Sequence, residues 1–203
     1  MRHGYPLALP GQRIGLLGGS FDPAHDGHLR LSEEALKRLR LDRVWWLVTP
    51  GNPLKAHQPA PMAERIAFAR SLITDPRIVV TGIEARLGTR KTIDTVTALQ
   101  RDCPGVHFVW LMGTDNMVQF SQWARWREIA ARIPMAVMAR PGSRLKARVS
   151  KAAQVLADDR LPESQAARLA TTPPPAWVQI EMPMSKTSSS AIRAARQGAA
   201  KKA

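Results

Sequence analysis

Two histidines stand three residues apart in residues 18–28, which read GGSFDPAHDGH. An apolar run precedes this segment and an amphipathic run follows it, which predicts a turn between a strand and a helix. If that helix begins near Asp26, both imidazoles lie around its first turn, where free N–H groups and the helix dipole favour a phosphate. Gly18 and Gly19 would let a polyanion approach the backbone closely. The segment therefore predicts a phosphate site with two N–H donors from the histidine rings.

Two other interpretations fit the same residues. Ser20 and Asp22 are typical turn and cap residues, and a single histidine near a helix start usually makes only local hydrogen bonds. A metal site is the second alternative, since His25, His28 and Asp22 could supply three ligands. We favour phosphate, because the flanking glycines suit a polyanion and no further histidine or cysteine stands nearby.

A second candidate phosphate site lies in residues 185–193, which read SKTSSSAIR. Ser188, Ser189 and Ser190 precede an apolar helical stretch, and Arg193 falls within its first turn. Hydroxyls, a helix N-terminus and a guanidinium this close together suit the outer phosphates of a nucleotide. Simple helix capping with an exposed arginine is the alternative, and the histidine segment makes us prefer phosphate.

Two loops carry further candidates for ligand contact. Gly113, Thr114 and Asp115 follow the longest apolar run, so their loop should fall at the ligand edge of a sheet, where a carboxylate can accept ribose hydroxyls. A helix N-cap is the competing role for Thr114 or Asp115. Lys55, in a proline-rich loop, is either a phosphate contact or merely a solvated lysine.

The tryptophans divide by their surroundings. Trp45, Trp46 and Trp110 stand inside apolar runs, which predicts that they are core residues. Trp123 follows the polar pair Ser121-Gln122, which makes it the better candidate for the wall of a wet cleft.

The elements that must position these residues alternate between strands and helices. Continuous apolar runs bounded by glycine and proline predict strands at 13–17, 44–48, 78–80, 106–112, 133–138 and 177–182. Helical spacing predicts helices at 28–41, 62–73, 92–99 and 191–197. This order predicts one α/β domain, a Rossmann-like parallel sheet with helices on both faces and ligands at the carboxyl ends of its strands.

The domain is expected to span residues 13–197, between an N-terminal arm (1–12) and a basic C-terminal tail (198–203). Pro6 and Pro10 interrupt the arm, which we expect to be loose. Residues 143–172 are rich in alanine and arginine, and Pro173-Pro174-Pro175 follows them. We interpret this region as an insertion or mobile connection rather than a second domain.

Composition limits the class of protein. Thirty lysines and arginines against sixteen acidic residues give a net charge of +14, which favours an anionic partner, either nucleic acid or a polyphosphate. The single cysteine excludes an intrachain disulfide, and no apolar run approaches the roughly 18 residues of a membrane helix. We therefore expect a cytoplasmic protein without a membrane partner, and its oligomeric state is left open.

Residues 18–28 resemble the signature of the nucleotidyltransferase superfamily that contains the HxGH motif. Four further segments narrow the resemblance to the nicotinate-nucleotide adenylyltransferases of bacterial NAD synthesis: KTIDT at 91–95, GTDNM at 113–117, FSQW at 120–123 and TSSSAIR at 187–193. The last is similar to the ISSTxIR motif of the family, with Thr187 in place of the usual isoleucine and Ser190 in place of threonine.

The resemblance implies adenylyl transfer from ATP to nicotinate mononucleotide, giving deamido-NAD and pyrophosphate. The implied catalytic residues are His25, His28, Ser20 and Arg193. The implied ATP-binding residues are Gly18, Gly19, Phe21, Lys55, Gly113, Asp115, Ser188, Ser189 and Ser190. The implied mononucleotide-binding residues are Thr92, Asp94 and Trp123, with Trp123 stacking on the pyridine ring. Mg²⁺ is expected to arrive with ATP rather than at a dedicated protein site.

Two classes of alternative remain open. A related adenylyltransferase could prefer nicotinamide mononucleotide or phosphopantetheine. A basic nucleic-acid-binding module is the alternative of another class, although no aromatic-interleaved basic strand or nucleic-acid motif is present, so we expect no specific nucleic-acid partner.

Overall fold

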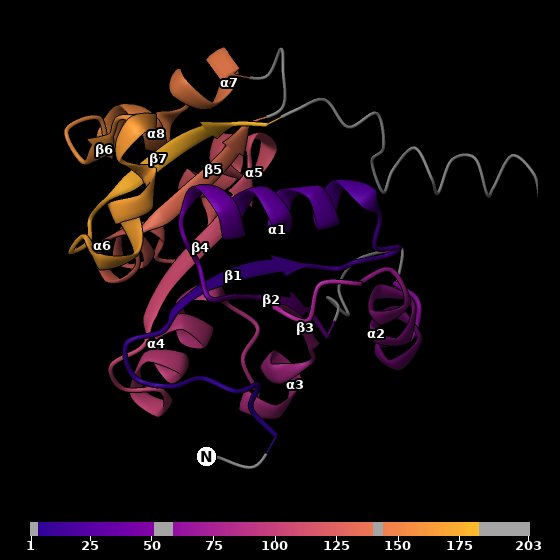
Figure 1. The fold of residues 1–203 in the computed structure, drawn as a ribbon. Helices are drawn as coiled ribbons and strands as arrows, with labels where there is room; N and C mark the ends of the chain where they lie inside the picture. The colour runs from indigo at the N-terminus through magenta and orange to yellow at the C-terminus, as the bar shows by residue number, and fades with distance from the viewer. Residues whose placement is uncertain (1–3, 51–58, 140–143, 183–203) are drawn as a thin grey trace, which may run out of the picture.

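The computed structural model describes residues 4–50, 59–139 and 144–182. Seven parallel strands form one sheet in the order β3-β2-β1-β4-β5-β7-β6 (Figure 1). Their bounds are β1 (Arg13–Gly19), β2 (Arg43–Val48), β3 (Ile78–Thr81), β4 (His107–Gly113), β5 (Met135–Ala139), β6 (Arg160–Leu161) and β7 (Trp177–Glu181). The predicted parallel α/β sheet is confirmed.

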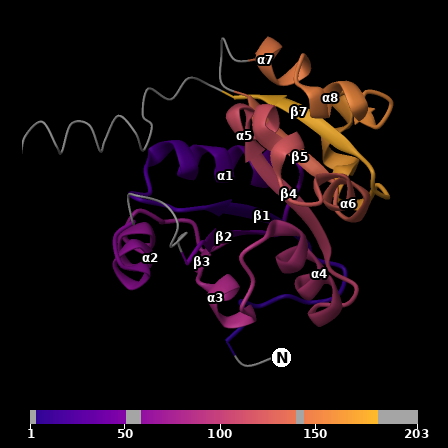
Figure 2. The same cartoon turned by 180° about the vertical axis from the view of Figure 1, so that it is seen from behind.

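Helices cover both faces of the sheet. One face carries α1 (Asp26–Arg38), α2 (Met62–Ser71) and the 3₁₀ helix η2 (Glu163–Thr171). The other carries α3 (Ile83–Leu87), α4 (Thr92–Asp102), α5 (Thr114–Gln119), η1 (Phe120–Gln122), α6 (Trp126–Arg132), α7 (Arg144–Arg148) and α8 (Lys151–Val155). In Figure 1 α1 lies above the ribbons of β1 and β2 and α3 lies below them, an arrangement that Figure 2 shows from behind.

Successive side chains of each strand enter opposite cores. Trp45 packs with the cluster under α4, whereas its neighbour Trp46 packs with the cluster under α1, and neither is exposed. Burial on both faces explains why the strands read as continuous apolar runs instead of alternating ones. The predicted core positions of Trp45, Trp46 and Trp110 are confirmed.

The site residues are brought together where the order of the strands reverses. β1 lies between β2 and β4, and the chain leaves β1 toward β2 and β3 before it crosses back to β4. The connections after β1 and β4 therefore diverge, and this switch point is where open α/β sheets commonly bind their ligands. Gly18 and Gly19 end β1, and Gly113 ends β4.

The described part of residues 143–172 is not a mobile connection, contrary to expectation. It forms α7, α8, the edge strand β6 and η2, and the indole Nε1 of Trp177 donates to the Leu156 carbonyl at 2.7 Å. Ala152 and Leu169 are fully buried in the two cores. Although the composition of this region resembles that of a linker, its apolar side chains pack into the two cores and hold it against the sheet.

The described part of the N-terminal arm is not loose either. The Tyr5 hydroxyl donates to Asp102 Oδ2 at 2.6 Å, and the Gly11 N–H donates to the Gly105 carbonyl at 2.7 Å. The arm thus binds the far end of α4 and the turn before β4. Within the described ranges, no helix is long and apolar enough to span a membrane.

Candidate active site

The two histidines cap the first helix reciprocally. His25 is the N-cap of α1, and its Nδ1 accepts from the Gly27 N–H at 3.0 Å, while Nδ1 of His28 accepts from the His25 N–H at 3.2 Å. The helix begins at Asp26, as the sequence predicts. The ring centroids lie 3.9 Å apart, so the two imidazole rings pack directly against each other.

This arrangement selects a tautomer. Since Nδ1 of each ring accepts a backbone N–H, the proton of each neutral ring is on Nε2. His25 is buried and His28 half-buried, so the rings are fixed before any ligand arrives. Capping and phosphate binding, which the sequence presents as alternatives, are compatible because they use different nitrogens of the same rings.

An aromatic stack supports the histidine pair from below. The Phe21 ring stacks on Trp46 at 5.0 Å and lies 4.8 Å from the His28 ring. The Trp46 Nε1 donates to Ser32 Oγ at 2.7 Å, and this hydroxyl donates to the His28 carbonyl at 2.9 Å. Phe21 therefore contributes its ring to the core and only its backbone to the loop, where its φ of 47° is in the left-handed region.

Tight packing requires the two glycines at the end of β1. A Cβ at Gly18 would lie 3.0 Å from the Trp110 ring, and one at Gly19 would lie 3.3 Å from the Phe21 ring. Both contacts are closer than a side chain normally tolerates, so the loop backbone approaches the two rings directly. Ser20, which follows, is exposed.

The loop after β4 lies at the same edge of the sheet. Gly113 is the N-cap of α5, Thr114 is buried in its first turn, and Asp115 is exposed beside it. The N-cap role considered for Thr114 or Asp115 is therefore wrong, because Gly113 occupies the cap without a side-chain hydrogen bond. The Asp115 carboxylate remains at the surface of this edge.

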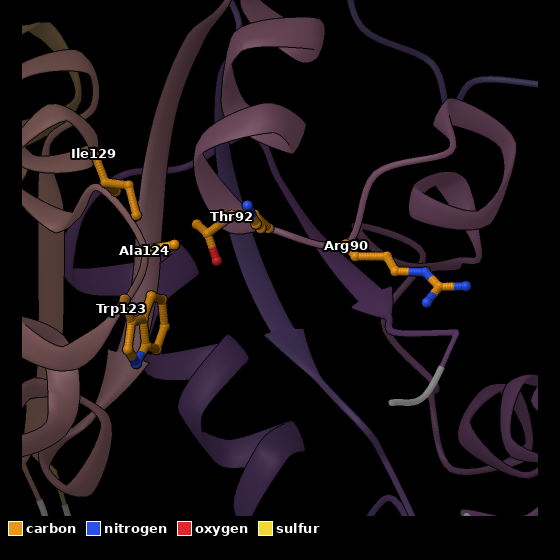
Figure 3. A pocket seen from close by; sticks show the side chains of 6 residues that line it. Arg90, Thr92, Trp123, Ala124 and Ile129 are labelled. Atoms are coloured by element: carbon orange, nitrogen blue, oxygen red, sulfur yellow. The ribbon is translucent and has the colours of Figure 1, made fainter. Parts of the chain in front are cut away.

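A pocket of about 180 Å³ lies between the start of α4 and the segment after η1. It is lined by Arg90, Lys91, Thr92, Trp123, Ala124 and Ile129. Figure 3 shows Thr92 and Trp123 facing it from the two sides, while Arg90 extends away from Trp123. The half-buried Trp123 ring meets Trp110 edge-on, with centroids 6.2 Å apart. Since Trp110 also packs on Gly18, one indole connects the pocket to the glycine loop.

At the start of α4, beside this pocket, the N–H groups of Thr92 and Ile93 have no acceptor among the described residues, whereas the Asp94 N–H donates to the Lys91 carbonyl at 3.0 Å. Lys91 is the N-cap of α4 and makes no capping hydrogen bond through its side chain. The first turn of an 11-residue helix therefore presents N–H groups and its positive dipole end close to Trp123. Lys91 and Arg90 add two cations that the sequence interpretation missed, and their adjacency to Thr92 was the signal that could have identified them.

Asp94 lies beside the pocket without lining it. Its carboxylate is exposed and pairs with Nη1 of Arg125 at 3.8 Å. Arg125 makes two closer contacts with Glu128, at 2.6 and 2.8 Å, which raise the pKa of the arginine and lower that of Glu128. Asp94 thus connects α4 to the segment that carries Trp123.

Five predicted site residues lie outside the described ranges: Lys55, Ser188, Ser189, Ser190 and Arg193. In the described part of the chain, no cluster of three histidine, cysteine, aspartate or glutamate side chains could hold a metal ion. The described site residues form two groups, one around His25 and His28 and one around Trp123 and Thr92.

Comparison with known proteins gives a consistent result. Residues 16–195 match the cytidylyltransferase-like family. A probable nicotinate-nucleotide adenylyltransferase of Cereibacter sphaeroides is 57% identical over 181 residues, which cover 89% of this chain and 96% of the relative. A protein of the same description from Roseobacter denitrificans is 53% identical over 193 residues, covering 95% of this chain and 97% of the relative.

Solved structures show the same fold. A Plasmodium falciparum nicotinic acid mononucleotide adenylyltransferase complexed with NaAD superimposes with a TM-score of 0.68 at 15% identity, covering 90% of this chain and 83% of that one. Such low identity supports the fold alone. Sequence identity above 50% along nearly the whole length of the two bacterial relatives shows that the chain belongs to the nicotinate-nucleotide adenylyltransferase family.

Proposed function

We propose that the protein transfers the adenylyl group of ATP to nicotinate mononucleotide, releasing deamido-NAD and pyrophosphate. The observation that carries this proposal is the histidine pair, whose Nδ1 atoms accept backbone N–H groups, so that the proton of each neutral ring is on Nε2. It stands at the end of β1 in a chain whose relatives are described as nicotinate-nucleotide adenylyltransferases.

The reaction needs no enzyme nucleophile. An oxygen of the mononucleotide 5′-phosphate attacks the α-phosphorus of ATP, a new P–O bond forms, and the bond to the bridging oxygen of pyrophosphate breaks. The attacking phosphate is already an anion, so no general base is required. Alignment and neutralisation of charge remain for the protein to supply.

In this mechanism His25 and His28 donate from Nε2 to the phosphate oxygens on which negative charge grows, with Ser20 beside them. The backbone at Gly18, Gly19 and Phe21 cradles the phosphates, and Asp115 and Gly113 meet the adenosine side. Lys55, Ser188, Ser189, Ser190 and Arg193 complete the grip on the outer phosphates. Mg²⁺ enters as part of the MgATP substrate and neutralises its oxygens.

The pocket at Trp123 suits the nicotinate group. A pyridine ring stacks on the indole, and its carboxylate accepts from N–H groups at the start of α4 near Thr92, beside the cation of Lys91. An amide would lose the charge attraction and set its own NH₂ against those donors. Discrimination of about 100-fold in kcat/KM corresponds to roughly 3 kcal/mol, which lost charge-assisted hydrogen bonds can supply.

Pyrophosphate release with MgATP tests the proposal directly. Nicotinate mononucleotide, nicotinamide mononucleotide and phosphopantetheine are supplied as competing acceptors. We expect turnover with nicotinate mononucleotide, at least about 100-fold lower kcat/KM with the amide, and none with phosphopantetheine. Equal use of the amide would indicate a dual-specificity enzyme, and turnover with phosphopantetheine alone would contradict the assigned acceptor.

The net charge of +14 makes nucleic acid the competing ligand class. A salt titration of binding to duplex and single-stranded oligonucleotides separates the two, because phosphate-backbone binding falls steeply with salt. We expect only weak, salt-sensitive binding. We also propose that the reaction occurs in the cytoplasm, which a sequence with the single cysteine Cys103 suits.

A further inference from the structure

Arg65 is a buried cation that the proposed mechanism does not use. It lies on α2, outside both groups of site residues, and only 3% of its surface is exposed. Each of its three guanidinium nitrogens donates to a different main-chain carbonyl: Nε to Ala60 at 2.7 Å, Nη1 to Ser20 at 2.5 Å and Nη2 to Thr49 at 3.0 Å. Arginines are rarely this buried unless they are paired, so its position requires an explanation.

The three carbonyls belong to three separate segments. Ser20 follows β1, Thr49 follows β2, and Ala60 precedes α2. The Thr49 N–H in turn donates to the Gly19 carbonyl at 3.0 Å. The Arg65 side chain therefore joins the segments that follow β1 and β2 to the start of α2.

The bond to Ser20 fixes the orientation of one peptide unit. In a planar trans peptide the C=O and the following N–H point in opposite directions. Since the Ser20 carbonyl points at Arg65, the Phe21 N–H points away from it. Within the described part of the chain this N–H has no acceptor, and Phe21 adopts the left-handed conformation that is typical of backbone anion sites.

A buried guanidinium is costly, which argues that its geometry matters. Burial lowers the pKa of Arg65, and the nearby Asp22 carboxylate offsets this in part. A methionine would fill the same space without the cost of a charge, but it would leave the Ser20 and Thr49 carbonyls without their donor. A lysine would keep the charge but lacks the planar fork that reaches three carbonyls at once.

We propose that Arg65 is a positioning residue for ATP: by binding the Ser20, Thr49 and Ala60 carbonyls, it holds the Ser20–Phe21 peptide with its N–H directed at the phosphate site. This inference rests on the proposed function in that the anion is MgATP. It assigns Arg65 no contact with substrate. Its effect should therefore appear in ATP binding and turnover, and not in mononucleotide binding.

The test compares Arg65→Lys and Arg65→Met with Arg70→Met, an exposed arginine on the same helix. Direct titration gives the Kd of a non-hydrolysable MgATP analogue, and steady-state assays give KM for each substrate. We expect Arg65→Lys to raise the Kd of the analogue and the KM for ATP about tenfold and to lower kcat, as loss of charge-assisted hydrogen bonds does. The KM for the mononucleotide should stay within about twofold, and Arg70→Met should resemble the wild type.

Chemical rescue provides a readout that a purely structural role would not give. Millimolar guanidinium added to folded Arg65→Met should restore part of the ATP affinity. Equal changes in both KM values, unchanged ATP affinity in folded Arg65→Lys, or loss of folding in both Arg65 variants would each overturn the inference. If the wild type binds the analogue but transfers nothing to nicotinate mononucleotide, the proposed function fails, whereas the titrations still decide the role of Arg65.

Discussion

The loop between β1 and α1 is held by contacts within the protein through its histidine Nδ1 atoms, the Ser20 carbonyl and the Phe21 ring, whereas the pocket at Trp123 is lined mainly by half-buried and exposed residues. In the loop, the histidine rings cap α1, Phe21 stacks on Trp46, and Arg65 binds the Ser20 carbonyl. Around the pocket, α4 begins without a side-chain cap, and Arg125, in the segment after Trp123, forms exposed ion pairs with Asp94 of α4 and with Glu128.

This difference separates two tasks of one active site. Donors fixed before the ligand arrives stabilise a transition state without reorganisation, so changes in the loop should act mainly on kcat. An open wall with a ring and free N–H groups binds a ligand equally in the ground state and the transition state, so changes there should act mainly on KM. The predictions below test this division from the largest expected effect to the smallest.

His25→Asn should lower kcat by roughly 10²–10³, the usual cost of losing one transition-state donor. Asparagine is a preferred N-cap, so it can still accept the Gly27 N–H and keep the start of α1. It lacks the Nε2–H that the mechanism requires. Steady-state kinetics with both substrates, together with thermal unfolding, separate the two roles of this residue.

His107→Asn is the matched control for that change. His107 is exposed at the first residue of β4, at the opposite edge of the sheet from the histidine pair. Its substitution should leave kcat unaltered. Wild-type turnover in a folded His25→Asn protein would assign His25 to capping alone.

Trp123→Ala should raise the KM for both mononucleotides by about 10- to 100-fold, because stacking of a base on an aromatic ring contributes roughly 1–3 kcal/mol. The kcat should fall much less, and the preference for acid over amide should persist since the discriminating donors are on the main chain of α4. Trp123→Phe keeps an aromatic ring, so its KM values should lie between those of the wild type and of Trp123→Ala. A collapse of kcat at unaltered KM would place Trp123 with the loop rather than with the pocket.

The sequence predicted the loop better than the pocket for a physical reason. Contacts within residues 18–28 are local, so glycines, a helix start and two histidines at fixed spacing determine how they lie. The pocket joins Thr92 to Trp123 from segments about thirty residues apart, and only the packing of α4 against α6 brings them together. The local sequence around Thr92 does not show the contact with Trp123, and only the adjacency of Lys91 and Arg90 to Thr92 indicates that they also line the pocket.

Arg65 and the 144–172 region were missed for a related reason. An arginine within a helix is normally a solvated residue, and nothing around Arg65 in the sequence shows that the carbonyls of Ser20 and Thr49 converge on it. Alanine-rich composition likewise does not reveal that β6 pairs with β7. Long-range contacts of this kind are a property of the completed fold.

Glu84→Gln should stabilise the protein by about 1 kcal/mol at neutral pH, since it removes a buried charge whose side-chain donor, among the described residues, is a single hydroxyl. Glu84 is a buried residue of α3, and Thr95 of α4 donates from its Oγ1 to the Glu84 Oε1 at 3.1 Å. Burial raises the pKa of this carboxyl, and the Thr95 hydrogen bond offsets the shift only in part. Urea unfolding across a range of pH measures the effect.

The sign of the pH dependence follows from the raised pKa. The unfolded chain ionises Glu84 near about pH 4.3, whereas the folded protein does so only at higher pH. The wild type therefore loses stability relative to Glu84→Gln as pH rises above the unfolded value, and the two proteins should converge below it. Glu33→Gln, at an exposed position on α1, is the matched control for a glutamate-to-glutamine change. A gap independent of pH would mean that the pKa of Glu84 is the same in the folded and the unfolded protein.

Asp94→Asn should have the smallest effect, and it decides whether this residue belongs to the pocket. Its carboxylate is half-exposed and lies 3.8 Å from Arg125, which makes closer contacts with Glu128. Surface ion pairs of this kind contribute little and are screened by salt, so the unfolding midpoint should move by less than about 1 °C.

Resemblance to the family implies that Asp94 binds the mononucleotide, and in that case the KM would rise at least about tenfold, as for a lost charge-assisted hydrogen bond. The geometry instead favours a KM within about twofold of the wild type, because the carboxylate does not line the pocket. Mononucleotide KM values at low and high salt distinguish the two, since a direct contact in the pocket would survive salt that removes the surface pair.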